Sequence, residues 1–171
     1  MPVTAMKNLP DDAHVWIFGA SSALNPEQSE VLLRAVEEFQ RNWAAHGAPL
    51  TTAGDLRDQR FLVVAVEPSV DPSGCSIDRL FKLLQSLSGE LGISLVDSGS
   101  IFYRDDRGEV QAATRDEFRN LAQRGAVTGE SIVFDNAVQT LGDLRHGRWE
   151  RPASQSWHGR LMAPAGAFVS T

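Results

Sequence analysis

An unbroken apolar run, Phe61-Leu62-Val63-Val64-Ala65-Val66, constrains the fold more than any other stretch of the sequence. A short apolar run without polar interruption is typical of a strand that is buried on both faces. Further along the chain, apolar residues recur at helical spacing from Ile77 to Leu91, and Gly92 is the expected helix stop. The sequence therefore predicts a protein that combines a buried sheet with amphipathic helices.

The segments on either side of this run predict the other elements of an N-terminal part. The run Val15 to Phe18 predicts a second buried strand, and Leu50 to Leu56 and Ile93 to Val96 predict two further short strands. Asn25 and Gln28 form a capping box at the start of a helix that follows the first strand. The order strand, helix, strand, strand, helix, strand is that of the ferredoxin-like, or split βαβ, fold.

The next fifty residues have a different pattern. Asp105 to Gly108 is a hairpin turn signal between two short strands, and Thr114 with Glu117 forms a second capping box that starts a short helix. The run Ile132 to Phe134 then predicts a buried strand. These elements predict a small strand-helix-strand module.

The chain is thus expected to be an α+β protein in three parts. Residues 1–100 form the ferredoxin-like part, and residues 101–150 form the small module packed on it. Residues 151–171, which contain two prolines and many small residues, are expected to be an extended or partly disordered tail.

Composition excludes several classes of function. The formal net charge is −6 and the sequence has no basic run, which argues against general binding to nucleic acid or to an anionic membrane. No apolar run approaches the ~20 residues of a transmembrane helix. A single cysteine excludes an intramolecular disulfide framework and fits a reducing compartment, so we expect a cytoplasmic protein.

Five short motifs follow one another along the chain: Trp43-Ala44-Ala45-His46-Gly47, Arg60-Phe61, Ser73-Gly74-Cys75-Ser76-Ile77-Asp78, Ile132-Val133-Phe134-Asp135-Asn136 and Ser156-Trp157-His158. Together they resemble an uncharacterised bacterial family whose members often carry the label "ABC transporter ATPase". An ATPase of that class needs a glycine-rich loop with Gly-Lys-Ser/Thr, and neither lysine of the chain, Lys7 or Lys82, follows a glycine. The sequence therefore argues against ATP hydrolysis.

A second, local resemblance covers residues 101–150. It is carried by Phe102-Tyr103, Gly108, Thr114-Arg115-Asp116-Glu117-Phe118, Leu121, Gly125 and Glu130-Ser131-Ile132-Val133-Phe134. This pattern is similar to bacterial GYF-like modules, which are small strand-and-helix adapters. The resemblance implies a protein-interaction role, because some relatives bind proline-rich peptides through an aromatic patch.

Cys75 is a candidate nucleophile because it stands at an expected helix start, where backbone N–H groups and the helix dipole favour a thiolate. His46 is its candidate base. Asp78, one turn further along the helix, opposes a thiolate, and a buried structural cysteine is the alternative.

The same helix start is also a candidate anion site. Ser73, Gly74 and Ser76 supply hydroxyl and N–H donors, and Arg79 supplies a positive charge one turn in. Ordinary helix capping is the competing interpretation. The four histidines show no metal-ligand spacing, so neither a metal nor a cofactor is expected.

These observations favour a non-enzymatic interaction or adapter protein. Its candidate interaction residues are the aromatic residues of the second half of the chain: Tyr103, Phe134, Trp149 and Trp157. The expected partner is another protein, or a second copy of the chain in a homodimer. The alternatives are a Cys75-dependent thiol enzyme of acyl-transfer or hydrolytic type, and a sensor of small anions or nucleotides that uses the segment Ser73 to Ile77.

Overall fold

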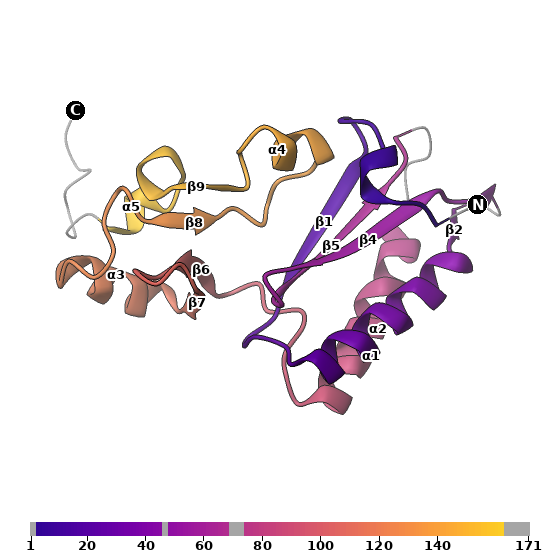
Figure 1. Ribbon diagram of the computed structural model, residues 1–171, viewed down its shortest axis with the longest axis horizontal. Coiled ribbons are helices and arrows are strands. Elements are labelled where there is room, and N and C mark those ends of the chain that lie inside the picture. The colour runs from indigo at the N-terminus through magenta and orange to yellow at the C-terminus, as the bar shows by residue number, and fades with distance from the viewer. Residues whose placement is uncertain (1–2, 46–47, 69–73, 163–171) are drawn as a thin grey trace. The chain divides into compact units, whose positions relative to one another are not determined.

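The computed structural model describes residues 3–45, 48–68 and 74–162 of the 171-residue chain (Figure 1). The chain forms an α+β protein that divides into two compact units. Unit 1 comprises Met1–Ser98 and Asn136–His146, and unit 2 comprises Gly99–Asp135 and Gly147–Thr171. Within the described residues, no helix is both long enough and apolar enough to cross a bilayer.

Unit 1 is built on an antiparallel sheet with the strand order β1-β5-β4. Its strands are β1 (His14–Gly19), β4 (Thr52–Arg57) and β5 (Phe61–Val66). The apolar run predicted as the most buried strand is the central one, β5, and every one of its residues is buried. The neighbouring strands flank it in register, so that Val64 pairs with Trp16 of β1 and with Gly54 of β4.

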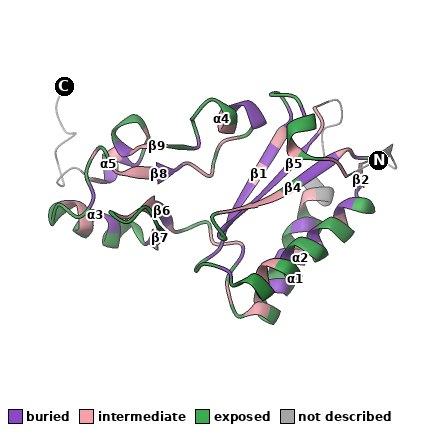
Figure 2. Ribbon diagram, in the orientation of Figure 1, coloured by how far each residue is buried: buried purple, intermediate pink, exposed green. Residues whose placement is uncertain are grey.

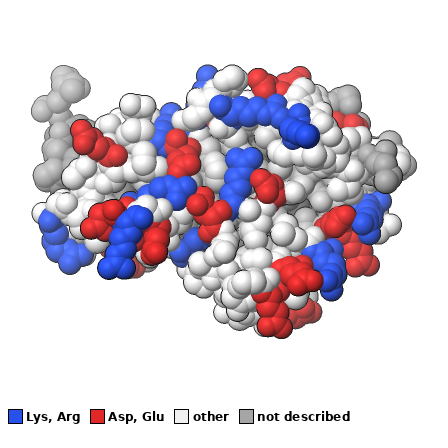
Figure 3. Space-filling view, in the orientation of Figure 1, with Lys and Arg blue, Asp and Glu red and all other residues white. Residues whose placement is uncertain are grey.

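The helices α1 (Pro26–Arg41) and α2 (Gly74–Leu91) lie on one face of this sheet (Figures 1 and 2). The predicted capping box is present, because Asn25 Oδ1 accepts from Gln28 N at 2.8 Å and Gln28 Oε1 accepts from Asn25 N at 2.9 Å. The core between the helices and the sheet is made mainly of large aliphatic and aromatic side chains: Phe18, Leu24, Leu32, Val36, Trp43, Leu50, Leu62, Val64, Val66, Leu80, Leu84 and Leu87. The outer face of α1 carries alternating acidic and basic side chains (Figure 3).

The fourth strand predicted at Ile93 to Val96 does not form. Ser94 O accepts one backbone hydrogen bond from Ser21 N at 2.9 Å, beside the end of β1. Leu95 N, however, donates to Ser88 Oγ at 2.9 Å, so a helix side chain takes the place that a neighbouring strand would occupy. Leu95 itself is buried in the core of unit 1. The segment thus lies beside the residues that follow β1, but it forms no strand.

Unit 1 also contains a segment from the second half of the chain, Asn136–His146, and here the structure differs from the expected boundary. Val15 N donates to Gln139 O at 3.0 Å and Leu141 N donates to Ala13 O at 3.0 Å, so the segment runs beside β1. It ends in the short helix α4 (Leu141–Arg145). These long-range hydrogen bonds have no local sequence signal.

Unit 2 contains an antiparallel sheet with the order β7-β6-β8-β9. Its strands are β6 (Ile101–Arg104), β7 (Val110–Ala113), β8 (Ile132–Phe134) and β9 (Glu150–Pro152), and its helices are α3 (Arg115–Gln123) and α5 (Gly159–Met162). The capping box of Thr114 and Glu117 is present, and the fully buried Phe118 of α3 lies in the core of the unit.

The structure differs from the expected tail at residues 150–162. These residues form β9, a short 3-10 helix over Ala153–Gln155 and α5. Ala153 and Leu161 are buried in the core of unit 2, and burial of these apolar side chains explains why the segment is ordered against the sheet. The remaining elements of unit 1 are a short 3-10 helix over Met6–Asn8 and the strands β2 (Ala44–Ala45) and β3 (Ala48–Pro49), which pair antiparallel.

Candidate functional site

The predicted thiol and anion sites fall largely outside the described part of the chain. His46 and Ser73 are not among the described residues, and for Gly74, Cys75 and Ser76 only the backbone is described, as the start of α2. The Cys75–His46 pair and the anion site of Ser73 to Ile77 therefore stay predictions. Arg79 is described, and it is an exposed residue on the second turn of α2.

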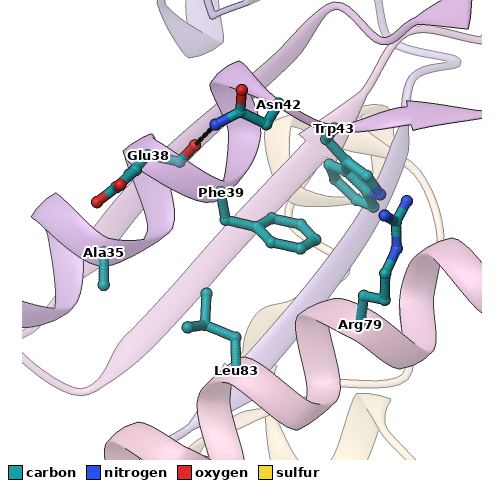
Figure 4. A pocket seen from close by; sticks show the side chains of 7 residues that line it. All are labelled: Ala35, Glu38, Phe39, Asn42, Trp43, Arg79 and Leu83. Atoms are coloured by element: carbon teal, nitrogen blue, oxygen red, sulfur yellow. Dashed lines mark hydrogen bonds between the residues drawn. The ribbon is translucent and has the colours of Figure 1, made fainter.

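Arg79 lines a pocket between α1 and α2 with a volume of about 330 Å³ (Figure 4). The other lining residues are Ala35, Glu38, Phe39, Asn42, Trp43 and Leu83. Most of this lining is apolar, and the volume lies near the lower end of the roughly 300–1,000 Å³ range of small-molecule sites. The pocket belongs entirely to unit 1.

Trp43 is fixed in this pocket by the end of α1. Trp43 N donates to Gln40 O at 3.2 Å, Leu50 N donates to Trp43 O at 3.1 Å, and the indole packs on the Phe39 ring with centroids 5.2 Å apart. The residue is only 2% exposed. Its indole Nε1–H nevertheless has no hydrogen-bond partner among the described residues. A buried donor without an acceptor is unfavourable, so this N–H is the chemically unsatisfied group of the pocket.

The polar groups around this N–H are arranged as donors rather than acceptors. Figure 4 shows the Arg79 guanidinium ending beside the nitrogen edge of the Trp43 indole. The Glu38 carboxylate points away from both groups (Figure 4). Asn42, the C-cap residue of α1, donates from Nδ2 to Glu38 O at 3.1 Å, which fixes the Asn42 side chain against the last turn of the helix. The Trp43 indole N–H and the Arg79 guanidinium are therefore two donors that lie side by side in the pocket, and the Glu38 carboxylate does not reach toward them (Figure 4).

Unit 2 has a second hollow, of about 560 Å³, between its hairpin and α3. The lining residues are Tyr103, Ala112, Ala113, Glu117, Asn120, Leu121, Gln123 and Arg124. The half-buried Tyr103 ring packs edge-on against Phe118 with centroids 5.8 Å apart. Burial, and then the nearby Asp105 and Glu117, raise the pKa of Tyr103, so its hydroxyl is a neutral donor at neutral pH.

The four aromatic residues predicted to form an interaction surface divide into two pairs. Phe134 and Trp149 are 2% and 4% exposed, and their rings pack together with centroids 5.2 Å apart. Trp157 is 38% exposed and stacks on the His158 ring at 3.9 Å. The accessible members of the predicted set are therefore Tyr103 and Trp157, and Tyr103 lines the hollow of unit 2.

Arg60 and His158 are two buried polar residues for which the sequence alone predicts no role. Arg60 is 7% exposed, and its guanidinium donates to Ala20 O at 3.1 Å and to Ser21 O at 2.7 Å, which fixes the turn after β1. His158 is 1% exposed, with Nδ1 2.7 Å from Ser156 Oγ, and burial lowers its pKa to about 4. Both residues belong to motifs that carry the family resemblance, and in the structure both side chains are buried. Among the described residues, no three histidine, cysteine or acidic side chains are grouped to hold a metal ion.

The sequence matches no protein-family model, and no curated protein and no solved structure is significantly similar to it.

Proposed function

We propose that this chain is a non-enzymatic cytoplasmic interaction protein, and that the hollow of Tyr103 in unit 2 binds an extended, proline-rich segment of a partner protein. The single observation that carries the proposal is this hollow, which is lined by the half-buried Tyr103 together with apolar and hydrogen-bonding side chains. The order hairpin, helix, strand, strand in unit 2 supports a GYF-like kinship, and the order β1-β5-β4 in unit 1 supports a ferredoxin-like one.

The side chains that line the hollow suit a peptide segment that offers hydrogen-bond acceptors and few hydrogen-bond donors. The Tyr103 hydroxyl, the side-chain amides of Asn120 and Gln123, and the Arg124 guanidinium all provide donors. A proline-rich segment has free carbonyl oxygens and lacks most backbone N–H groups, and its preformed extended helix loses little entropy on binding. Ala112, Ala113 and Leu121 provide an apolar surface for the pyrrolidine rings.

The experiment is a fluorescence-anisotropy titration of the full chain with labelled decaproline and with a labelled Gly-Ser peptide of equal length. We expect saturable binding of decaproline and at least several-fold weaker binding of the Gly-Ser peptide. Tyr103→Phe removes one hydrogen-bond donor, so it should weaken decaproline binding by about five-fold, which corresponds to about 1 kcal/mol.

Arg124→Gln, at the C-cap of α3, and Arg119→Gln, within α3, are the matched variants. Arg124 lines the hollow, whereas Arg119 pairs with Asp116 at 3.2 Å and does not line it. Decaproline binding should weaken only in the Arg124 variant. Equal binding of the two peptides, no saturable binding, or equal effects of the two arginine substitutions would each contradict the proposal.

A further inference from the structure

We propose that the pocket between α1 and α2 binds a small organic monocarboxylate with a compact apolar body, and that Trp43 Nε1 and Arg79 hold its carboxylate. This site is separate from the peptide hollow of unit 2, and its lining residues all belong to unit 1. The inference therefore stands or fails independently of the proposed function.

The first support is the buried indole N–H of Trp43. The residue is 2% exposed and its Nε1 has no hydrogen-bond partner among the described residues. Leaving a buried donor unsatisfied costs roughly 1–3 kcal/mol. A ligand oxygen in the pocket removes that cost, whereas an apolar ligand leaves it in place. The unsatisfied donor thus favours a ligand that carries an acceptor.

The second support is the charge of Arg79. On α1, Arg34 and Arg41 are exposed and each pairs with a glutamate one turn earlier, at 2.6 Å and 2.8 Å. Arg79 has no such partner within the described part of the chain, although it is the basic residue that lines the pocket. A guanidinium binds a carboxylate with two parallel hydrogen bonds. The Arg79 guanidinium lies beside the Trp43 indole nitrogen, so both donors are on one side of the pocket (Figure 4).

The remaining lining decides the class of anion. Phe39, Leu83 and Ala35 offer apolar surface, and a single cation faces it, so the pocket does not suit a phosphate or a dicarboxylate. Glu38 also lines the pocket, and its carboxylate points away from the two donors, so it leaves them available to one carboxylate (Figure 4). The volume of about 330 Å³ limits the apolar body to roughly one aromatic ring or a short branched chain. Phenylacetate is a probe with these properties.

The test is a titration of the full chain with phenylacetate, followed by the indole Nε1–H resonances in 15N-HSQC spectra. Trp43→Phe identifies the Trp43 resonance. We expect this resonance to shift saturably with a Kd of about 1 mM or tighter. The neutral analogue 2-phenylethanol, which has the same ring and a similar length, should bind at least about ten-fold more weakly.

Arg79→Gln should weaken phenylacetate binding by about ten-fold or more, equivalent to about 1.4 kcal/mol, while Arg34→Gln should leave it unchanged. Because Arg79 is exposed, its substitution is compatible with the fold, and an unchanged Trp16 resonance verifies this. Three outcomes would overturn the proposal: no saturable shift of the Trp43 resonance, equal binding of 2-phenylethanol, or equal phenylacetate binding by the Arg79→Gln variant and the wild type.

Discussion

Arg145 Nη1 donates to Asp11 Oδ1 at 2.7 Å, which joins two residues 134 positions apart in the sequence. The same guanidinium donates through Nη2 to the carbonyl oxygens of Leu9 at 2.7 Å and Met6 at 3.1 Å. The neighbouring His146 Nε2 lies 3.1 Å from the other oxygen of Asp11. Arg145 thus links α4 to the N-terminal segment, in addition to the backbone hydrogen bonds that join residues 136–146 to unit 1.

Replacing Arg145 with alanine should lower the free energy of unfolding by about 1–3 kcal/mol, because several charge-assisted hydrogen bonds are lost and the carbonyl oxygen of Leu9 loses a partner. Urea unfolding followed by circular dichroism measures the change. Arg34→Ala is the control, since Arg34 forms only an exposed pair with Glu30 and should change the stability by less than about 0.5 kcal/mol. Equal effects of the two variants would contradict a fastening role for Arg145.

Gly142 provides an independent test of the same connection. A Cβ atom added at Gly142 would lie 3.1 Å from Asp11 O and 3.2 Å from Asp11 Cβ, and Gly142 N donates to that same Asp11 oxygen at 2.7 Å. Gly142→Ala should therefore destabilise the protein by about 1–3 kcal/mol.

Gly89→Ala is the matched control in α2, where an added Cβ meets no atom within 4 Å. Alanine is the better helix former, so this variant should gain about 0.5–1 kcal/mol. Thermal unfolding curves of the two variants should therefore shift in opposite directions from the wild type. A stabilising Gly142→Ala would show that α4 does not pack closely on Asp11.

The elements that the sequence predicts well are those that depend on residues close to one another along the chain. The capping boxes at Asn25 and Thr114 are present because the residues that form them stand three positions apart. The run Phe61 to Val66 becomes the central strand because its alternate residues supply apolar side chains to both faces. The segment beside β1 could not be predicted in this way, since its hydrogen bonds connect residues more than 120 positions apart.

The candidate site shows the same limit. Trp43 continues the helical spacing of apolar residues that starts at Leu32, which predicts a core residue, and Trp43 is indeed buried with Phe39 against it. Its indole N–H lacks an acceptor among the described residues because α2 places Arg79 and Leu83 in the same pocket. That placement depends on tertiary packing, which the local sequence does not indicate. Likewise, Phe134 ends a short apolar run and Trp149 lies in polar sequence, and nothing local indicates that their rings pack on each other.

The stability of the protein should depend on pH through His158. Burial lowers the pKa of this ring from 6.5 to about 4 in the folded state. Above pH 6.5 the ring is neutral in both states, so its contribution to stability is fully present. As the pH falls from 6.5 to about 4, only the unfolded chain takes up the proton, and the free energy of unfolding should fall by up to about 3 kcal/mol.

Urea unfolding at about pH 7 and about pH 5, with His158→Gln beside the wild type, measures this effect. Glutamine does not titrate, so the variant should lose less stability over the same interval, whatever its stability at neutral pH. An NMR titration of the His158 ring provides the direct check. A ring that titrates near 6.5 would show that it is not buried as a neutral group.

The thiol enzyme alternative makes a separate prediction about Cys75. Asp78 lies one turn further along α2, and its charge opposes a thiolate at the helix start. We expect the rate of alkylation by iodoacetamide to rise with pH with a midpoint at or above ~8.5, the value for an ordinary thiol. Asp78→Asn should move this midpoint to lower pH, whereas Glu90→Gln, at the opposite end of α2, should not.

Because a nucleophilic cysteine works as its thiolate at neutral pH, a wild-type midpoint below ~7 would favour the enzyme over the non-enzymatic interaction protein.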